Sequence, residues 1–144
     1  MAMNAKNMPA DELFFGHKAC AGCGGSLAVR AALKVLGPNA VAALPAGCMN
    51  AVGFNFPQLC FANNAFITPF AATASVLTGI RAGLEAQGED PDKFNVVGFA
   101  GDGGTADIGI QALSGAIDRN EDIIYICYDN EAYMNTGIQK SGLT

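Results

Sequence analysis

The strongest constraint on the fold lies in residues 95–128, where two apolar runs flank a glycine-rich turn and a helical pattern. NVVGFA (95–100) and IIYICY (123–128) have the length and the residue types of buried strands. Between them, GDGG is typical of a tight turn, and residues 106–117 carry apolar side chains at helical spacing. This order predicts a parallel sheet with a right-handed crossover, and therefore an α/β fold with its site at the C-terminal ends of the strands.

The residues before this unit predict one helix and one further strand. Residues 27–36 form the helix, with Ser26 as a candidate N-cap and Gly37 just after the last turn. The short apolar run 41–44 predicts the strand, and PAGCMN after it is interpreted as a loop.

A second helix is predicted over residues 71–86, with Gly88 as its stop signal. Residues 1–15 are interpreted as a loosely ordered N-terminal arm, which leaves residues 16–144 as one domain. A chain of 144 residues that is 51% hydrophobic is long enough for one core and too short for two.

Charge is distributed unevenly, since residues 35–80 contain no Asp, Glu, Lys, Arg or His. Prolines and asparagines interrupt this uncharged segment, so it has no apolar run of the roughly 20 residues that a membrane-spanning helix needs. We expect the core, a cofactor or a partner subunit to cover it. The net charge of −5 argues against nucleic-acid binding, and the polar N-terminus lacks a secretory signal, which predicts a cytoplasmic protein.

The GDGG turn is a candidate diphosphate site because it joins a strand to the N-terminus of a helix. Free backbone N–H groups and the helix dipole favour phosphate there. Residues 101–106 also match the relaxed dinucleotide fingerprint GxGxxG/A, and Asp129 follows the next strand, near where a ribose-binding carboxylate belongs. An NAD-dependent Rossmann oxidoreductase is therefore one alternative.

Asp102 favours a diphosphate held through a metal. A carboxylate inside the turn repels pyrophosphate unless a divalent cation separates them, and Mg²⁺ accepts one or two protein oxygens beside phosphate oxygens. Asn130, at the tip of the adjacent parallel strand, can supply the second oxygen. A purely structural turn with Asp102 as a capping residue is the remaining interpretation.

Five cysteines in a chain without a secretory signal indicate metal binding or redox chemistry. Cys20 and Cys23 form a CxxC pair before the first helix, and Cys48 follows after 24 intervening residues. The pair alone fits half a metal site, a thioredoxin-like redox pair, or a non-catalytic iron–sulfur or zinc module. Cys127 is predicted to be a core side chain. Cys60 has no primary role, and the alternative for it is that of a substitute fourth metal ligand.

Two titratable residues stand close to these motifs. His17, the only histidine, precedes the CxxC pair and is predicted to make a structural hydrogen bond. Asp107 is predicted to stabilise the start of the helix after the GDGG turn, with cofactor contact as the alternative.

The motifs together resemble a known family. Gly101-Asp102-Gly103, with Asn130 after the next strand, is similar to the thiamine-diphosphate motif, which opens with GDG and closes on an asparagine. GHKACAGCGGSLAVR, PAGCMN and DNEAYMNTGIQ make residues 16–144 resemble the β subunits of 2-oxoacid:ferredoxin oxidoreductases, the pyruvate synthase type above all. The implied fold is the diphosphate-binding half of a parallel-sheet thiamine-diphosphate domain, incomplete in this chain.

The resemblance implies a role for each motif residue. The side chains of Asp102 and Asn130 and the carbonyl of Ala132 hold Mg²⁺, and Asn135 is the catalytic residue near the thiazolium ring. The other implied cofactor contacts are Gly101, Gly103 and Gly104 on the diphosphate, Met134 in the same loop as Asn135, and Ala46, Gly47, Cys48 and Met49 as one wall.

The resemblance also implies a 4Fe-4S cluster in a cysteine loop over residues 16–48. Cys20, Cys23 and Cys48 match three of its ligands. Four thiolates are the usual set, so the fourth is expected beyond residue 144, in a chain that is truncated or completed by another polypeptide.

The implied activity is the oxidative decarboxylation of a 2-oxoacid, most closely pyruvate, to acyl-CoA and CO₂, with coenzyme A as co-substrate. Electrons pass through the cluster to ferredoxin or a ferredoxin-like subunit. No residue here matches the glutamate that activates the cofactor, so an α subunit is expected to supply it, with segment 35–80 as part of the interface. Neither a nucleic acid nor a membrane is an expected partner.

Overall fold

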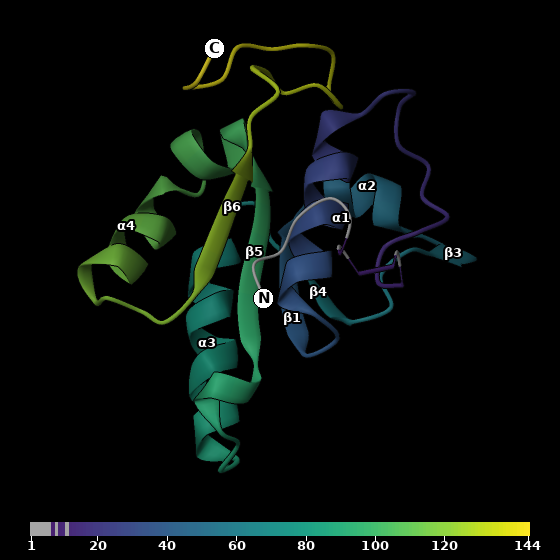
Figure 1. The fold of residues 1–144 in the computed structure, drawn as a ribbon. Helices are drawn as coiled ribbons and strands as arrows, with labels where there is room; N and C mark the ends of the chain where they lie inside the picture. Colours follow the sequence, from purple (N-terminus) through teal and green to yellow (C-terminus); the bar gives the residue numbers. More distant parts are fainter. Residues whose placement is uncertain (1–6, 8, 11) are drawn as a thin grey trace.

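The computed structural model describes residues 7, 9, 10 and 12–144. Its centre is a four-stranded sheet of order β4-β1-β5-β6 in which every neighbouring pair is parallel (Figure 1). The strands are β1 (Ala40–Pro45), β4 (Asn64–Thr68), β5 (Asn95–Gly101) and β6 (Ile124–Tyr128). The predicted α/β fold is confirmed, and the carboxyl ends of all four strands lie at one end of the sheet.

Helices cover both faces of the sheet (Figure 1). Alternate residues of β1 point to opposite faces: Ala42 and Leu44 pack with α1 (Gly24–Leu36), and Ala43 packs with Leu77 of α3 (Thr73–Ala86). All of β1 is buried, as expected for an inner strand of a parallel sheet.

The outer strand β6 is less buried than predicted. Residues 123–128 read as a fully buried strand, but Ile124 is 37% exposed and only Tyr128 is fully buried. Cys127, predicted to be a core side chain, is half-buried. The reason is position, because β6 pairs with β5 on one side only within the described residues.

The first helix begins earlier than predicted. It starts at Gly24, so Ser26 is not its N-cap but lies in the first turn, where its hydroxyl donates to the carbonyl oxygen of Cys23 at 2.8 Å. Gly37 ends it as expected, with φ of +76° and its N–H bonded to the Leu33 carbonyl at 2.9 Å. The second predicted helix is α3, which begins at Thr73, two residues later than predicted.

The helix expected at residue 106 begins four residues later. A single wide turn, η2 (Gly103–Asp107), comes first and is closed by a 3.0 Å bond from the Ile108 N–H to the Gly103 carbonyl. Helix α4 (Ile110–Asp118) follows. A Cβ at Gly109 would collide with the Gly104 carbonyl oxygen, so this backbone approach needs glycine.

The sequence PAGCMN, interpreted as a loop, contains the start of a short helix, α2 (Cys48–Gly53). The Met49 N–H at its start donates to the Tyr128 hydroxyl at 3.3 Å, a partner distant in sequence. A small antiparallel hairpin of β2 (Phe54–Asn55) and β3 (Gln58–Leu59) comes next, and sequence analysis missed it together with β4.

Three phenylalanines, Phe14, Phe54 and Phe61, form an aromatic cluster beside α2, in which Phe61 is tilted against Phe14 and stacked on Phe54. Phe14 is 1% exposed, so the end of the predicted arm 1–15 belongs to the core; residues 1–6, 8 and 11 of that arm lie outside the described residues.

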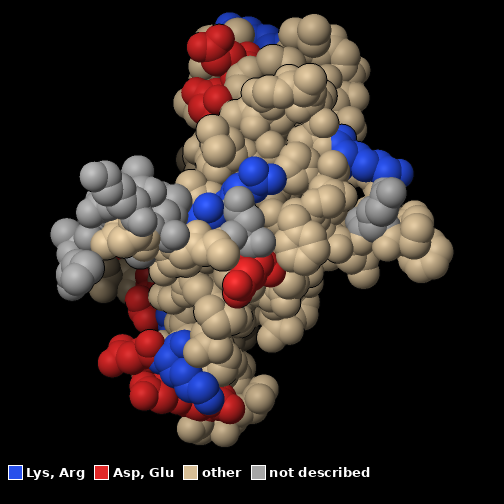
Figure 2. All heavy atoms as spheres, turned by 45° about the vertical axis from the view of Figure 1, so that its right-hand side comes forward, with Lys and Arg blue, Asp and Glu red and all other residues tan. Residues whose placement is uncertain are grey.

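The uncharged segment is only partly covered. Phe56 is 90% exposed and Leu59 is 64% exposed. Figure 2 shows a face composed mostly of uncharged residues, with charged side chains at its upper and lower ends and a few across its middle. No helix in the described part of the chain is long and apolar enough to cross a membrane.

Arg81 closes the end of the sheet opposite the strands' carboxyl ends. It is 6% exposed and donates at 2.9 Å to the carbonyl of Pro91 in η1 (Pro91–Lys93) and to the carbonyl of Asp122 just before β6. These hydrogen bonds satisfy the buried guanidinium and hold the two loops together.

Candidate cofactor site

A pocket opens at the carboxyl ends of β1, β5 and β6, as the parallel topology predicts. The space that it spans, together with the open solvent at its mouth, is about 490 Å³. Its walls come from the ends of β1 and β5 and from the loop after β6. The predicted site residues that line it are Ala46, Gly47, Cys48, Gly101, Asp102, Gly103, Gly104, Asn130, Ala132, Met134 and Asn135.

Asp102 stands at the inner end of the pocket, directly after β5. Its side chain is 2% exposed, and the two carboxylate oxygens have different partners. The Ser141 hydroxyl donates to Oδ2, while the amide of Asn130 lies 2.9 Å from Oδ1. A buried carboxylate requires such partners, because desolvation without them is costly.

Asn130 brings three polar groups to one point. With its amide nitrogen turned inward, it donates to Asp102 Oδ1 at 2.9 Å and to the Ala132 carbonyl at 2.8 Å. With its amide oxygen turned to the same place, a carboxylate, a carbonyl and an amide oxygen converge. Hard oxygen ligands of this kind suit Mg²⁺, so the donor set fits the ion that the resemblance implied.

Aromatic side chains lie directly against the glycine turn, which lines the pocket. A Cβ on Gly103 would collide with the ring of Tyr133, and one on Gly101 would lie 3.4 Å from the ring of Tyr128. The Thr105 hydroxyl donates to the Gly101 carbonyl at 2.7 Å and closes the turn. Gly103 therefore needs to be glycine, because any side chain there would displace the Tyr133 ring.

The loop after β6 folds back over this turn and is held by Asp107. The Tyr133 hydroxyl donates to Asp107 Oδ2 at 2.7 Å, and the Gly142 N–H donates to the same oxygen at 3.0 Å. The hydrogen bond to Asp107 raises the pKa of Tyr133 to about 12. Asp107 makes no capping bond to α4, so it is not the cap of that helix.

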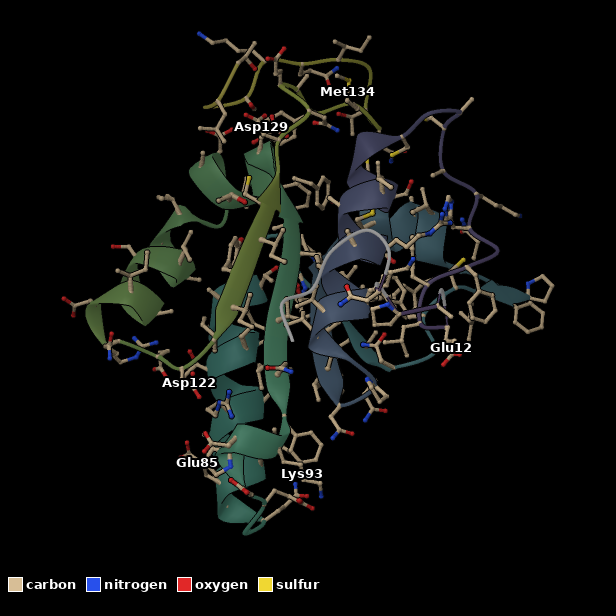
Figure 3. All side chains as sticks on the ribbon, viewed as in Figure 1. Glu12, Glu85, Lys93, Asp122, Asp129 and Met134 are labelled. Carbon is tan, nitrogen blue, oxygen red and sulfur yellow. The ribbon has the colours of Figure 1, made fainter. Side chains whose placement is uncertain are left out.

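Asp129 and Met134 lie together at this end of the molecule, whereas Glu85, Lys93 and Asp122 lie toward the other (Figure 3). Met134 is 41% exposed at the pocket. Asp129 does not line the pocket; its Oδ1 accepts a hydrogen bond from the Glu131 N–H at 2.8 Å and stabilises a turn. That geometry disfavours a ribose-binding role.

The three predicted cluster cysteines come from two helix starts. Cys23 is the N-cap of α1 and Cys48 is the first residue of α2, while Cys20 is exposed on the preceding turn. Burial, followed by the charges of Cys23 and Cys20, raises the pKa of Cys48, and the backbone N–H of Asn135 lowers it. The three thiols are thus close enough to influence one another, and Cys48 lies near Asn135 in the loop after β6.

The thiols are not gathered into a finished metal site. Across residues 12–144 and the other described positions, no group of three His, Cys, Asp or Glu side chains is close enough to hold a metal ion. The cluster therefore stays a prediction. Cys60 is 2% exposed, and its thiol donates to the Val52 carbonyl at 3.4 Å. His17 stacks on Phe14 and accepts a hydrogen bond from the Ala19 N–H, which is the structural role predicted for it.

The pocket differs from the sequence-based assignment at several residues, since Pro45, Phe70, Tyr133 and Thr136 line it without having been predicted. Met49 is 1% exposed in the core and does not line the pocket. Tyr128 does line it: its ring packs beneath Gly101, its hydroxyl receives the Met49 N–H, and burial strongly raises its pKa. The position of Tyr128 at the end of a predicted strand was the sequence signal that could have placed it at the site. No feature of the neighbouring sequence indicated Ser141.

Comparison with known proteins gives concordant similarities. The family model described as "Thiamine pyrophosphate enzyme, C-terminal TPP binding domain" matches residues 45–143. Pyruvate synthase subunit PorB of Methanothermobacter thermautotrophicus is 54% identical over 90% of this chain and 44% of its own length. Ketoisovalerate oxidoreductase subunit VorB of Pyrococcus horikoshii is 52% identical over 95% of this chain and 45% of its own. The chain thus spans less than half of these relatives.

A solved structure supports the fold. The 2-oxoglutarate:ferredoxin oxidoreductase from Magnetococcus marinus, with 2-oxoglutarate, coenzyme A and succinyl-CoA bound, superposes with a TM-score of 0.67. The match covers 92% of this chain and 48% of that chain at 22% identity, so it shows a shared fold. The resemblance inferred from the motifs is confirmed by these relatives.

Proposed function

The chain belongs to the thiamine pyrophosphate enzyme family through its C-terminal TPP-binding domain, and on this premise we propose that its pocket binds Mg²⁺ and thiamine diphosphate. The observation that carries the proposal is the meeting of Asp102, Asn130 and the Ala132 carbonyl beside a glycine turn. An anionic diphosphate and a divalent cation together satisfy both the turn and the carboxylate.

Each part of the pocket has a distinct task in this proposal. Asp102, Asn130 and Ala132 hold the ion, and the backbone of Gly101, Gly103 and Gly104 contacts the diphosphate. Bound thiamine diphosphate supplies a nucleophilic carbon and an electron sink, while the protein supplies orientation.

The two remaining walls face the reacting end of the cofactor. Met134 and Asn135 lie beside the thiazolium ring, with Asn135 as the catalytic residue, and residues 46–49 form the opposite wall. Met49 supports this wall from below, since it is buried and its N–H is held by Tyr128.

The reaction that we propose is the oxidative decarboxylation of a 2-oxoacid to acyl-CoA and CO₂, with electrons delivered to ferredoxin. Pyruvate is the first choice of substrate because the PorB relative is a pyruvate synthase subunit. The VorB relative, a ketoisovalerate oxidoreductase subunit, is almost as similar, so a branched-chain oxoacid is the competing substrate.

A 4Fe-4S cluster held by Cys20, Cys23 and Cys48 provides the electron path, with a fourth thiolate from outside residues 1–144. Its position beside the cofactor is supported by Cys48, which lines the pocket and has Cys23 and Cys20 among its neighbours. Hydrogen bonds to cluster ligands are a known means of setting a cluster's potential.

A second subunit completes the site by supplying the activating glutamate, and the complex works in the cytoplasm. The exposed side chains of segment 35–80 support this segment as part of the interface. These are Phe56, Leu59, Phe66 and Ile67, each at least 50% exposed.

Substitution of Asp102 tests the cofactor assignment. In the protein isolated with its co-purifying subunits, Asp102→Ala is expected to weaken Mg²⁺-dependent thiamine diphosphate binding, measured by calorimetry, by at least about 100-fold, since a direct ligand matters more than its supporting residues. Asp129→Ala, which removes a nearby exposed carboxylate, is the matched control and should bind normally. If NAD binding survives Asp102→Ala and the parent protein binds no thiamine diphosphate, the assignment of the pocket to Mg²⁺ and thiamine diphosphate is wrong.

Anaerobic purification tests the cluster. The expected result is a brown protein whose iron content falls when Cys48 is replaced by Ser. A colourless protein with stoichiometric zinc would refute the cluster and favour a zinc module.

A further inference from the structure

We propose that Ser141 is a positioning residue that orients the Asp102 carboxylate for the metal ion, an inference that rests on the proposed function. Ser141 lies 39 positions from Asp102 in the chain, and its hydroxyl donates to Asp102 Oδ2. Both side chains are buried, at 3% and 2% exposure. Water therefore does not compete for this hydrogen bond.

The hydrogen bond from Ser141 gives the two carboxylate oxygens of Asp102 different roles. Oδ2 is occupied by the Ser141 hydroxyl, so Oδ1 is the oxygen that faces Asn130 and the Ala132 carbonyl. Without the hydroxyl, the carboxylate could rotate about its terminal torsion, which is broad for aspartate. Ligating carboxylates are commonly fixed by such an outer partner, and its loss weakens metal binding.

Ser141 is itself anchored to the loop that supplies the other ligands. Its backbone N–H donates to Thr144 Oγ1 at 2.8 Å, and the Thr144 hydroxyl donates to the Glu131 carbonyl at 2.5 Å, one residue before Ala132. Ser141 thus fixes the position of the Asp102 carboxylate relative to the Ala132 carbonyl, because it is linked to both.

The hydroxyl also accepts a hydrogen bond from the Leu143 N–H at 3.2 Å, but the segment has other anchors that do not depend on it. Gly142 and Tyr133 are both bound to Asp107 independently of it. Loss of the Ser141 hydroxyl should therefore disturb the carboxylate more than the path of the backbone.

The Mg²⁺ dependence of thiamine diphosphate binding tests this role in the protein isolated with its subunits. Ser141→Ala is expected to raise the Mg²⁺ concentration for half-maximal binding about tenfold, with cofactor affinity at saturating Mg²⁺ unchanged. Ser114→Ala, on the exposed face of α4, is the matched control and should leave both values unchanged. Binding weakened equally at every Mg²⁺ concentration would indicate a merely structural role and overturn the proposal.

A second variant covers the case in which Ser141→Ala does not fold. Ser141→Cys keeps the side-chain volume but donates weakly, so a smaller rise in the Mg²⁺ midpoint is expected. An unchanged midpoint in a folded variant overturns the positioning role and leaves the proposed function standing. A parent protein that binds no thiamine diphosphate at any Mg²⁺ concentration overturns both.

Discussion

The cofactor pocket and the aromatic cluster lie in the same domain but are held together in different ways. At the pocket, Asp102 and Asp107 receive hydrogen bonds from a loop up to 39 residues away in sequence. In the aromatic cluster, the Phe61 ring is tilted against Phe14 and stacked on Phe54, with ring centroids 4.8 and 5.4 Å apart.

Because of this difference, we expect the two regions to respond differently to a bound ligand. Apolar packing depends little on what is bound, because it draws on water exclusion alone. Polar contacts around buried carboxylates instead depend on which charges are present, so the pocket should respond to Mg²⁺ and the cluster should not.

The largest effect on stability is expected from the aromatic cluster. Phe14→Ala should lower the free energy of unfolding by about 3–5 kcal/mol, because the side chain is fully buried and leaves a cavity. Its neighbour Phe15 is 52% exposed, so Phe15→Ala should cost less than about 1 kcal/mol. Urea unfolding measures both, and equal losses would contradict the assignment of Phe14 to the core.

An intermediate effect is expected from Gly103→Ala in the glycine turn of the pocket. The new Cβ meets the Tyr133 ring and forces it away from Asp107, at a cost of about 1–3 kcal/mol for overpacking. Thiamine diphosphate binding, followed by calorimetry, should weaken at the same time.

Gly79→Ala in α3 provides the matched control, since its Cβ meets open space. There the same substitution should stabilise the helix by about 0.5–1 kcal/mol. A stabilising Gly103→Ala would mean that the loop does not rest on the turn.

The smallest effect is expected from Tyr133→Phe, which removes one hydrogen bond to Asp107 and should cost about 1 kcal/mol. The neutral phenol makes this bond, and its pKa is raised from 10 to about 12. Its stabilisation is therefore complete below pH 10 and is lost as the pH rises through about 12.

Thermal unfolding of both proteins should accordingly show a constant difference between about pH 7 and 9, within the plateau below the phenol's pKa. A difference that vanishes in that range would exclude the bond as its source.

Sequence predicted those parts of the fold that local residues determine. The strand–turn–helix–strand unit follows from apolar periodicity, and the end of α1 follows from Gly37. Asp102 and Asn130 were expected to meet because parallel strands end on the same side, and they do.

The missed features depend on contacts between distant residues. The start of α2 depends on a hydrogen bond to Tyr128, and Ser141 reaches Asp102 only in the folded chain. The wide turn η2 depends on the approach of Gly109 to Gly104. Strand β4 has no clear alternation, because its outer position leaves three of its five residues exposed.

Strand β4 also has a consequence for handling the protein. Within the described residues it pairs with β1 alone, so one row of its N–H and C=O groups is open. Its sequence NAFIT has neither charge nor proline, and Phe66 and Ile67 are half exposed. An exposed edge strand of this kind can pair with the same strand of another molecule. We therefore expect the domain to aggregate at high concentration when β4 is left uncovered.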